Sequence, residues 1–389
     1  VAGLAACGNS GSSSAGSSSS SDGSTFKLGN IGPLTGAAAI YGNATKNGAQ
    51  LAVDEINAAG GSIKFEHNCQ DDEHDSEKSV NAYNNLKDWG LQVLVGPTTT
   101  NPCVAVSAET NSDNVFELTP SASSNDVIGG QPDADGNVTT SRKDNVFQMC
   151  FTDPNQGTAS AQYLAKKQLG TKIAVIYNNS DAYSTGIYKK FEAEAANQGL
   201  SIVSTSTFTD DNATDFSVQL NDAKNNGADL VFLPIYYTPA ALILTQANGM
   251  GYAPNFFGCD GMDGILTVEG FDTKLAEGLM LLTPFVATAT DEKTSAFTKA
   301  YKDAYGDEPI QFAADAYDCV YVIKELLEKT GCTPDMSASD ICDKLKAAIV
   351  DGYTYSGLTG ENMSWKDTGE VSKEPKGMVI KDGVYQPLD

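Results

Sequence analysis

The chain has 389 residues, with 25 basic and 50 acidic side chains and a formal net charge of −25 at neutral pH. Nucleic-acid binding requires a basic face, so this charge argues against a nucleic-acid partner and favours solubility outside the cell. Only two histidines are present, His67 and His74, which removes most catalytic triads and catalytic zinc sites from consideration. The body from Thr25 onward is too long for one ordinary core, so we expect two domains.

The N-terminal residues predict an exported, lipid-anchored protein. Leu4-Ala5-Ala6-Cys7 is similar to a bacterial lipobox, where a signal peptide is removed and the new N-terminal cysteine receives lipid. We therefore expect residues 1–7 to be a signal-peptide remnant, and Cys7 to anchor the protein outside the cytoplasm on the bacterial cell membrane. Residues 8–24 are mostly Gly and Ser and predict a flexible tether of roughly 20–25 Å. The alternative is a disordered N-terminus with an incidental cysteine.

The remaining cysteines offer two candidate disulfides. Without Cys7 seven cysteines remain, so at least one thiol has no partner within the chain. Cys332 and Cys342 flank a short loop, and Cys69 and Cys103 follow consecutive strand-like runs. Exported proteins permit disulfides, so Cys69–Cys103 and Cys332–Cys342 are both candidates, with the reduced form as the favoured alternative.

From Thr25 onward, short β-rich apolar runs alternate with amphipathic helical patterns. This alternation predicts an α/β protein with parallel-rich sheets. Ligands of such sheets bind outside the carboxyl ends of the strands, so the loops that follow the strands are the candidate binding loops. The predicted strands are 27–31, 63–67, 91–95, 115–119, 146–151, 172–177, 201–208, 229–235, 255–259 and 278–284, and the predicted helices include 47–59, 77–89, 156–169, 185–198, 215–226 and 239–248.

Two acidic segments raise metal binding as an alternative. Residues 133–137 faintly resemble a calcium loop but lack the closing Glu, and residues 67–74 combine His, Cys, Asp and Glu at no standard spacing. We interpret residues 126–144 as a solvated surface insertion and residues 67–74 as a polar loop. No metal and no other cofactor is expected.

Several post-strand loops carry groups suited to a zwitterion. The loops 96–100 and 120–124 place hydroxyls and backbone N–H groups at helix N-termini, where the helix dipole favours an anion. Helix capping is the alternative explanation for these Ser and Thr residues. Asp260 follows another predicted strand and could bind an ammonium group from across a cleft. Tyr183 and Tyr236 could close over a small ligand, unless they pack at the edge of their own sheet.

A series of motifs in fixed order supports a family resemblance. These motifs are Ile31-Gly32-Pro33-Leu34-Thr35-Gly36, Tyr41-Gly42, the helical run 48–57, Asp71-Asp72, Val95-Gly96-Pro97, the run 118–123 and the run 172–177. In them the chain resembles the Leu/Ile/Val-binding protein family, the type 1 periplasmic binding proteins of branched-chain amino-acid ABC transporters. The resemblance extends from Phe26 to about Gln386, which is essentially the whole body.

The resemblance implies a fold and a domain division. The type 1 periplasmic binding fold has two Rossmann-like lobes with a three-segment hinge, here near residues 148–152, 281–285 and 356–362. Residues 25–148 plus 285–358 are then the N-terminal lobe, and residues 149–284 plus 359–389 are the C-terminal lobe.

The resemblance also implies a set of ligand-binding residues. By position, Thr100 binds the ligand carboxylate, the Ser121 carbonyl and Asp260 bind the ammonium group, and Ser123 touches both groups. The residues implied to surround the rest of the ligand are Tyr183 and Tyr236 from the second lobe, and Tyr41, Thr99 and Phe312 around its side chain.

Two departures from the family pattern bear on the ligand. Thr98 and Thr99 stand where the family places apolar residues, and Ser121 stands where Ala is common. Hydroxyls left unpaired against an aliphatic side chain would cost about 1–3 kcal/mol each. A small polar or amide-bearing amino acid is therefore an alternative to a branched-chain ligand.

The function implied is that of a monomeric, extracytoplasmic solute-binding lipoprotein of an ABC importer. It would close its lobes on an amino acid and dock on a membrane permease, without enzymatic chemistry. Neither a Gly-x-Ser-x-Gly elbow nor a P-loop spacing is present in the sequence. The alternatives are a sensory lipoprotein whose partner is a membrane receptor, and an adhesive surface lipoprotein with a vestigial cleft.

Overall fold

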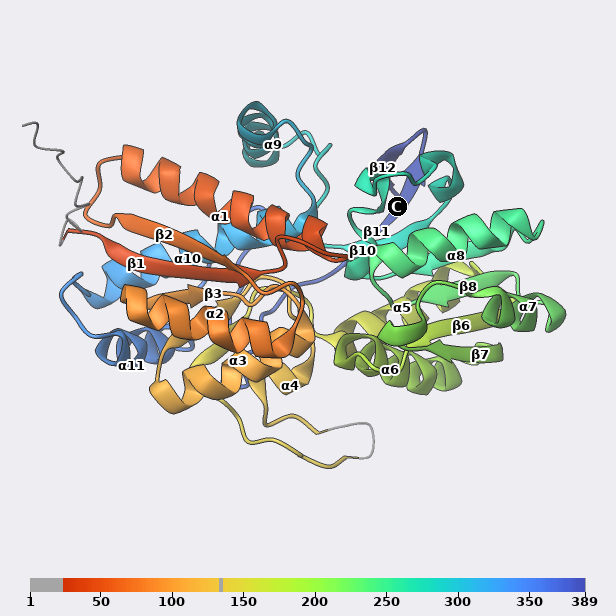
Figure 1. Ribbon diagram of the computed structural model, residues 1–389, viewed down its shortest axis with the longest axis horizontal. Helices are drawn as coiled ribbons and strands as arrows, with labels where there is room; N and C mark the ends of the chain where they lie inside the picture. The colour runs from red at the N-terminus through yellow and green to blue at the C-terminus, as the bar shows by residue number, and fades with distance from the viewer. Residues whose placement is uncertain (1–23, 133–135, 389) are drawn as a thin grey trace, which may run out of the picture.

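The computed structural model describes residues 24–132 and 136–388, which form two α/β lobes side by side (Figure 1). The first lobe is built on a five-stranded sheet in the order β2-β1-β3-β4-β5, and its strands pair in parallel. The second lobe is built on a seven-stranded sheet in the order β12-β11-β10-β9-β8-β6-β7, in which β11 pairs antiparallel with β10 and β12. The predicted α/β fold with parallel-rich sheets is confirmed.

The elements follow one another with the predicted alternation. The strands are β1 (Phe26–Gly32), β2 (Phe65–Asp71), β3 (Val93–Val95), β4 (Phe116–Thr119), β5 (Val146–Gln148), β6 (Ile173–Asn178), β7 (Ile202–Phe208), β8 (Leu230–Leu233), β9 (Asn255–Gly258), β10 (Met280–Thr283), β11 (Lys376–Lys381) and β12 (Val384–Pro387). The α-helices are α1 (Ala39–Ala58), α2 (Ser76–Trp89), α3 (Thr100–Asp113), α4 (Asn125–Ile128), α5 (Asp153–Lys167), α6 (Ala182–Gln198), α7 (Ser217–Asn225), α8 (Tyr237–Gly249), α9 (Glu292–Tyr305), α10 (Gln311–Thr330) and α11 (Ala338–Ile349), and the 3₁₀ turn η2 (Asp260–Met262) follows β9.

Each sheet is covered by helices on both faces. In β6, Ile173 and Val175 pack on the α5–α6 side, whereas Ala174 and Ile176 pack on the α7–α8 side. This division follows from the two-residue period of a strand, and it explains why such strands appear in the sequence as continuous apolar runs. The first sheet is covered in the same way, by α1, α10 and α11 on one face and by α2 and α3 on the other.

One hydrophobic cluster continues across the boundary between the lobes. It joins Tyr41 and Phe312, from helices that pack on the first sheet, to Ile235, Tyr237 and Met262 of the second lobe. All five side chains are at least 95% buried. The two lobes are therefore in direct apolar contact in this conformation.

The last crossing between the lobes lies later in the chain than expected. Met363, Trp365 and Val371 pack into the core of the first lobe, and Trp365 Nε1 donates to the carbonyl of Gln148 over 2.8 Å. Antiparallel bridges at Tyr355–Met363 and Trp365–Val371 fold this segment back onto the first lobe. Residues 359–371, which we expected in the C-terminal lobe, therefore lie with the N-terminal one.

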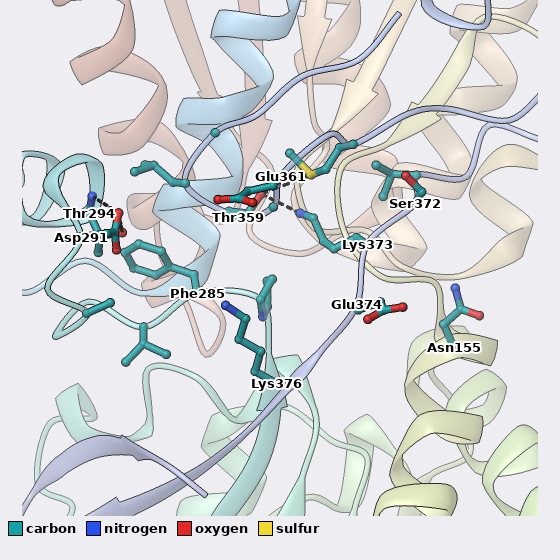
Figure 2. A pocket seen from close by; sticks show the side chains of 18 of the residues that line it. Asn155, Phe285, Asp291, Thr294, Thr359, Glu361, Ser372, Lys373, Glu374 and Lys376 are labelled. Carbon is teal, nitrogen blue, oxygen red and sulfur yellow. Dashed lines mark hydrogen bonds between the residues drawn. The ribbon is translucent and has the colours of Figure 1, made fainter. Parts of the chain in front are cut away.

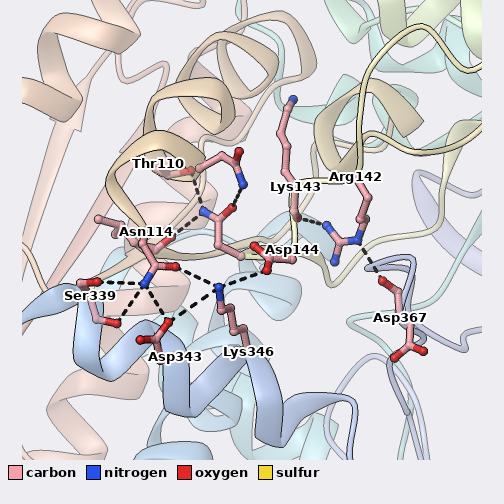
Figure 3. Close-up of polar contacts among 12 residues, drawn as sticks. Thr110, Asn114, Arg142, Lys143, Asp144, Ser339, Asp343, Lys346 and Asp367 are labelled. Atoms are coloured by element: carbon pink, nitrogen blue, oxygen red, sulfur yellow. Dashed lines mark hydrogen bonds and ion pairs between the residues drawn. The ribbon is translucent and has the colours of Figure 1, made fainter.

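The acidic segment 126–144 is anchored to the first lobe at its second end (Figure 3). Arg142 Nε donates to the carbonyl of Asp367 over 2.9 Å, and Lys346 Nζ lies 3.1 Å from both Asp144 Oδ2 and Asn114 Oδ1. Residues 136–141 before it are exposed. This placement agrees with a surface insertion.

The seven cysteines from Cys69 to Cys342 are all free thiols, so neither candidate disulfide forms. Cys69 lies on the edge strand β2, whereas Cys103 packs from α3 against the β4–β5 end of the sheet, with β1 and β3 between. Cys332 and Cys342 both pack as small apolar side chains in the core of the first lobe.

Some sequence predictions fall outside the described residues. These are the lipobox with Cys7, the tether as far as residue 23, and residues 133–135 of the acidic segment. Among the described residues, no helix combines the length and the apolar character that crossing a membrane requires.

Candidate functional site

A small cavity lies between the two lobes at the carboxyl ends of their strands. The space open to the centre of a water molecule is about 10 Å³, roughly what one water requires. Every expected ligand-binding residue except Ser123 lines it. The lining residues are Tyr41, Thr98, Thr99, Thr100, Ser121, Tyr183, Tyr236, Asp260, Gly261 and Phe312.

The first lobe contributes the N-terminus of α3. The chain turns sharply from β3 into this helix at Gly96, where φ is 116° and a Cβ atom would come 2.7 Å from the carbonyl oxygen of Ile31. Only glycine tolerates both conditions. Thr99 is the N-cap residue of α3, yet its side chain makes no capping hydrogen bond. The first N–H groups of α3 therefore have no side-chain cap and can donate hydrogen bonds to an anion.

His74 explains why Thr99 does not cap the helix. His74 Nδ1 lies 2.7 Å from Thr99 Oγ1, and its ring packs edge-on against Tyr236 of the other lobe at 5.4 Å. Glu73 and His74 both have a left-handed backbone, and the backbone N–H of His74 donates to Asp72 Oδ1 over 2.9 Å. This turn fixes the direction of the His74 side chain. Burial lowers the pKa of His74. We expected His74 in a polar loop, and no pattern in the sequence indicated its contact with the site.

The second lobe contributes a buried carboxylate in η2. Tyr183 Oη donates to Asp260 Oδ1 over 2.8 Å and accepts from the N–H of Gly261 over 3.0 Å. Gly261 is required for this approach, because a Cβ atom there would lie 2.6 Å from Tyr183 Oη. Burial raises the pKa of the Asp260 carboxyl to about 6. An ammonium group beside it would compensate the buried charge.

Aromatic rings from both lobes form the wall of the cavity. Tyr183 and Tyr236 stack with ring centroids 4.8 Å apart, and Tyr41 lies 5.2 Å from Tyr236 and 4.5 Å from Phe312. These rings offer apolar faces to a ligand side chain.

The lobes are also joined by hydrogen bonds beside the cavity. Tyr41 Oη donates to the carbonyl of Gly261 and accepts from the N–H of Tyr237 over 3.1 Å. Tyr237 Oη in turn accepts from the N–H of Ile40 over 2.9 Å. Four residues thus make reciprocal contacts across the cleft, and the conformation is a closed one.

The hydroxyls of the cavity wall are paired within the protein. Thr98 Oγ1 lies 2.8 Å from Thr45 Oγ1, Thr99 Oγ1 bonds to His74, and Ser121 Oγ donates to the carbonyl of Thr98 over 2.6 Å. A polar ligand was an alternative on the expectation that these hydroxyls would be left unpaired against an aliphatic side chain. The structure removes that assumption, because an aliphatic side chain would leave none of the three without a partner.

Ser123 is the expected site residue that does not line this cavity. It is fully buried, and its hydroxyl lies beside the buried carboxyl of Asp153. Ser124, its neighbour, is the residue that caps a helix, because its side chain accepts from the N–H of Asp126.

A larger cavity, of about 760 Å³, lies at the hinge and is lined by residues of the crossing segments (Figure 2). Lys373 Nζ there donates to Thr359 Oγ1 over 2.7 Å and lies 3.2 Å from Asp315 Oδ1. The side chains of Lys373 and Asp315 are only 1% and 3% exposed. These two charges are therefore satisfied within the protein.

Within residues 24–132 and 136–388, no group of three or more His, Cys, Asp or Glu side chains is arranged to hold a metal ion.

Comparison with known proteins assigns the family. The family model described as periplasmic binding protein matches residues 25–381. A Leu/Ile/Val-binding protein of Rhizobium johnstonii is 28% identical over 352 residues, which cover 89% of each chain. A leucine-, isoleucine-, valine-, threonine- and alanine-binding protein of Pseudomonas aeruginosa is 25% identical over 89% of this chain and 87% of its own length.

A solved structure gives the same result for the fold. The branched-chain amino acid transporter substrate binding protein of Streptococcus pneumoniae, in complex with isoleucine, is 28% identical. The match covers 93% of this chain and 98% of the Streptococcus pneumoniae chain, with a TM-score of 0.80. The chain therefore belongs to the periplasmic binding protein family, in the type 1 group of the Leu/Ile/Val-binding proteins.

Proposed function

We propose that the protein captures an aliphatic α-amino acid, of the branched-chain type, between its two lobes and delivers it to an ABC importer. One observation carries the proposal: the uncapped N-terminus of α3 and the buried carboxylate of Asp260 line the same cavity from opposite lobes. An anion site and a cation site in one cavity suit the two charged groups that every α-amino acid presents.

Each part of the ligand has a matching surface. The carboxylate would accept bonds from the first N–H groups of α3 and from the Thr100 hydroxyl, and the ammonium group would donate to Asp260 and to the Ser121 carbonyl. The side chain would then pack against the rings of Tyr41 and Phe312. Because the wall hydroxyls are already paired, an aliphatic side chain carries no desolvation penalty there.

The ligands of the relatives support this choice of side chain. The Streptococcus pneumoniae protein was solved with isoleucine, and the Pseudomonas aeruginosa protein is named for leucine, isoleucine, valine, threonine and alanine. We therefore expect leucine, isoleucine or valine as the preferred ligand, with threonine and alanine as weaker ones.

Capture would work by closure of the lobes. The cavity admits about one water in this conformation, so an amino acid fits only after the lobes separate and close again around it. A ligand that bonds to both lobes then stabilises the closed form by its differential affinity for it. The closed form would dock on a membrane permease, and a lipid on Cys7 would keep the protein near that permease. No covalent step is needed.

Binding can be tested on the full chain with Cys7→Ser, which prevents lipidation. After unfolding and refolding to remove bound ligand, thermal unfolding is measured with each of the twenty amino acids. A ligand at 100 times its Kd should stabilise the protein by about 2.7 kcal/mol. We expect that stabilisation with leucine, isoleucine or valine, and a screen in which no amino acid raises the melting temperature would refute the proposal.

The importer role needs a separate test. In the organism that carries the gene, membrane fractionation should find the unaltered protein with the membrane and the Cys7→Ser variant in the soluble fraction. Deletion of the gene should reduce uptake of the radiolabelled amino acid that binds. If uptake is unchanged, the protein serves a partner other than an importer.

A further inference from the structure

Gln156, a buried residue of the second lobe, supports the turn that carries the carboxylate of the cleft. It stands at the end of the first turn of α5 and is 4% exposed. Its Oε1 atom accepts from the backbone N–H of Asp260 over 3.0 Å. Gln156 does not line the cavity of the cleft, so its side chain acts on a ligand there through Asp260.

The amide group of Gln156 has both of its ends at Asp260. Because a backbone N–H needs an acceptor, the amide oxygen faces the N–H of Asp260 and the NH₂ group takes the other side. The NH₂ group is buried beside the Asp260 carboxyl and bonds to no other acceptor among the described residues. Burial raises the pKa of the Asp260 carboxyl to about 6, and the Gln156 amide opposes this rise because a hydrogen bond to the charged form favours that form.

The helices that carry the two side-chain donors to this carboxylate form a rigid pair. Tyr183, the other donor, belongs to α6. Helices α5 and α6 lie side by side (Figure 1), and a Cβ atom at Gly157 would come 2.4 Å from the carbonyl oxygen of Ile187. Helices in such close backbone contact have little freedom to shift, so they hold the Asp260 carboxylate more precisely than loops would.

The ionisable groups placed against Asp260 from the surrounding elements are acids, each of them neutral or negative. They are the phenols of Tyr41, Tyr183 and Tyr236, the thiols of Cys150 and Cys259, and the carboxyls of Asp153, Asp263 and Asp315. None of these acids compensates a negative charge on Asp260, and an ionised carboxyl among them opposes that charge. In the ligand-free protein, hydrogen-bond donors such as the Gln156 amide therefore favour the ionised carboxylate.

We propose that Gln156 is the positioning residue of the ammonium site, which fixes η2 through the Asp260 N–H and keeps the Asp260 carboxylate ready for the ligand ammonium group. This role rests on the proposed function, because it requires an amino acid in the cleft. Without the Gln156 amide, the buried N–H of Asp260 loses its acceptor and the carboxylate loses a donor. The carboxylate then takes up a proton at a higher pH and is held less firmly.

The test compares the leucine affinity of three proteins across a range of pH. The parent is the full chain with Cys7→Ser, refolded without ligand, and its Kd for L-leucine is measured by titration calorimetry from pH 5 to pH 8.5. Gln156→Met is the test variant, because methionine has nearly the same volume and no amide group. Gln162→Met is the matched control, since it makes the same substitution at an exposed position of α5.

Gln156→Met should raise the Kd for leucine about tenfold or more at pH 7.5, as expected for the loss of a hydrogen bond to a buried charge. It should also move the pH below which leucine affinity falls upward by at least half a unit. Gln162→Met should leave both quantities at the values of the parent. A change in Kd without a change in the pH profile would mean that Gln156 only fills space, and it would overturn the positioning role, as would an unchanged Kd.

A second measurement needs no substitution at Gln156 and covers the case in which Gln156→Met does not fold. In the ligand-free parent, labelled with ¹⁵N at glutamine, the assigned side-chain amide resonance of Gln156 should shift with pH as Asp260 titrates near its pKa of about 6. The shift should disappear in Asp260→Asn. An amide resonance that is constant from pH 5 to pH 8, or that still titrates in Asp260→Asn, overturns the proposal.

Failure of the proposed function has a different signature. If neither leucine nor any other amino acid binds the parent, the capture of an amino acid in the cleft is refuted. The amide resonance of the ligand-free protein still decides in that case whether Gln156 positions Asp260.

Discussion

Asp260→Asn is the most direct test of how the cleft recognises its ligand. Asp260 is 4% exposed, and its carboxylate accepts from Tyr183 Oη over 2.8 Å. Asparagine has nearly the same shape, and its carbonyl oxygen can keep the bond from Tyr183. The substitution therefore removes the negative charge and leaves the cavity otherwise intact.

The size of the effect follows from the burial of the charge. Loss of one partner of a buried, hydrogen-bonded ion pair costs about 2–5 kcal/mol. Since about 1.4 kcal/mol corresponds to a factor of ten, the Kd for leucine should rise about 30-fold or more. Isothermal titration calorimetry of ligand-free protein at pH 7.5 measures this directly. Asp272→Asn, at an exposed acid remote from the cavity, is the matched control and should leave Kd unchanged.

The same residue predicts the pH dependence of binding. Burial raises the pKa of Asp260 to about 6, so protonation competes with the ligand ammonium group below that pH. The affinity of the parent should be constant above pH 7 and fall up to tenfold per pH unit below pH 6. The Asp260→Asn variant should show no such fall. A Kd within threefold of the parent at pH 7.5, or a pH profile that the variant retains, would mean that the ammonium group binds elsewhere.

Three further predictions concern stability. Burial raises the pKa of Asp181 and of Asp315 to about 7, so the folded protein holds these protons more tightly than the unfolded chain between pH 4 and 7. That contribution is lost as pH rises through 7, and it outweighs the opposite effect of the two partly buried histidines. The ligand-free protein should therefore melt at a higher temperature at pH 5 than at pH 8, and equal melting temperatures would contradict this. Gly261→Ala should cost about 1–3 kcal/mol in urea unfolding and weaken leucine binding, because the new methyl group meets Tyr183 Oη at 2.6 Å, and a neutral result would mean that η2 relaxes freely. Lys373→Met should cost about 3–5 kcal/mol at pH 8, because it strands the buried Asp315 carboxylate, and the double variant with Asp315→Leu should recover most of the loss.

The loops of the cleft were predictable from the sequence because they obey local rules. Apolar runs separated by amphipathic helices predict parallel sheets, and in parallel sheets the carboxyl ends of neighbouring strands meet at one edge. Thr100, Tyr183 and Asp260 follow strands in this way, and they line one cavity in the structure. Thr100 belongs to the first lobe and Tyr183 and Asp260 to the second, so chain direction places each at the edge of its own sheet, and the arrangement of the two lobes brings the edges together.

Contacts between residues that are distant in the sequence could not be predicted from it. The pairing of Thr99 with His74 spans 25 residues, and the packing of Trp365 against the first lobe spans 217 residues to Gln148. No local sequence pattern predicts either contact. The lobe boundary and the state of the wall hydroxyls were therefore outside the reach of sequence reasoning.

The sequence by itself determined the two sheets, the order of their elements and the residue types offered to the cleft, because strand and helix periodicities are local properties of the chain. The tertiary structure decided which of those groups retain unused hydrogen-bonding capacity. It paired the hydroxyls of Thr98, Thr99 and Ser121, and it buried the carboxyl of Asp153 beside the hydroxyl of Ser123. Hydrogen-bond satisfaction is a property of the assembled interior, and it governs what each cavity can bind.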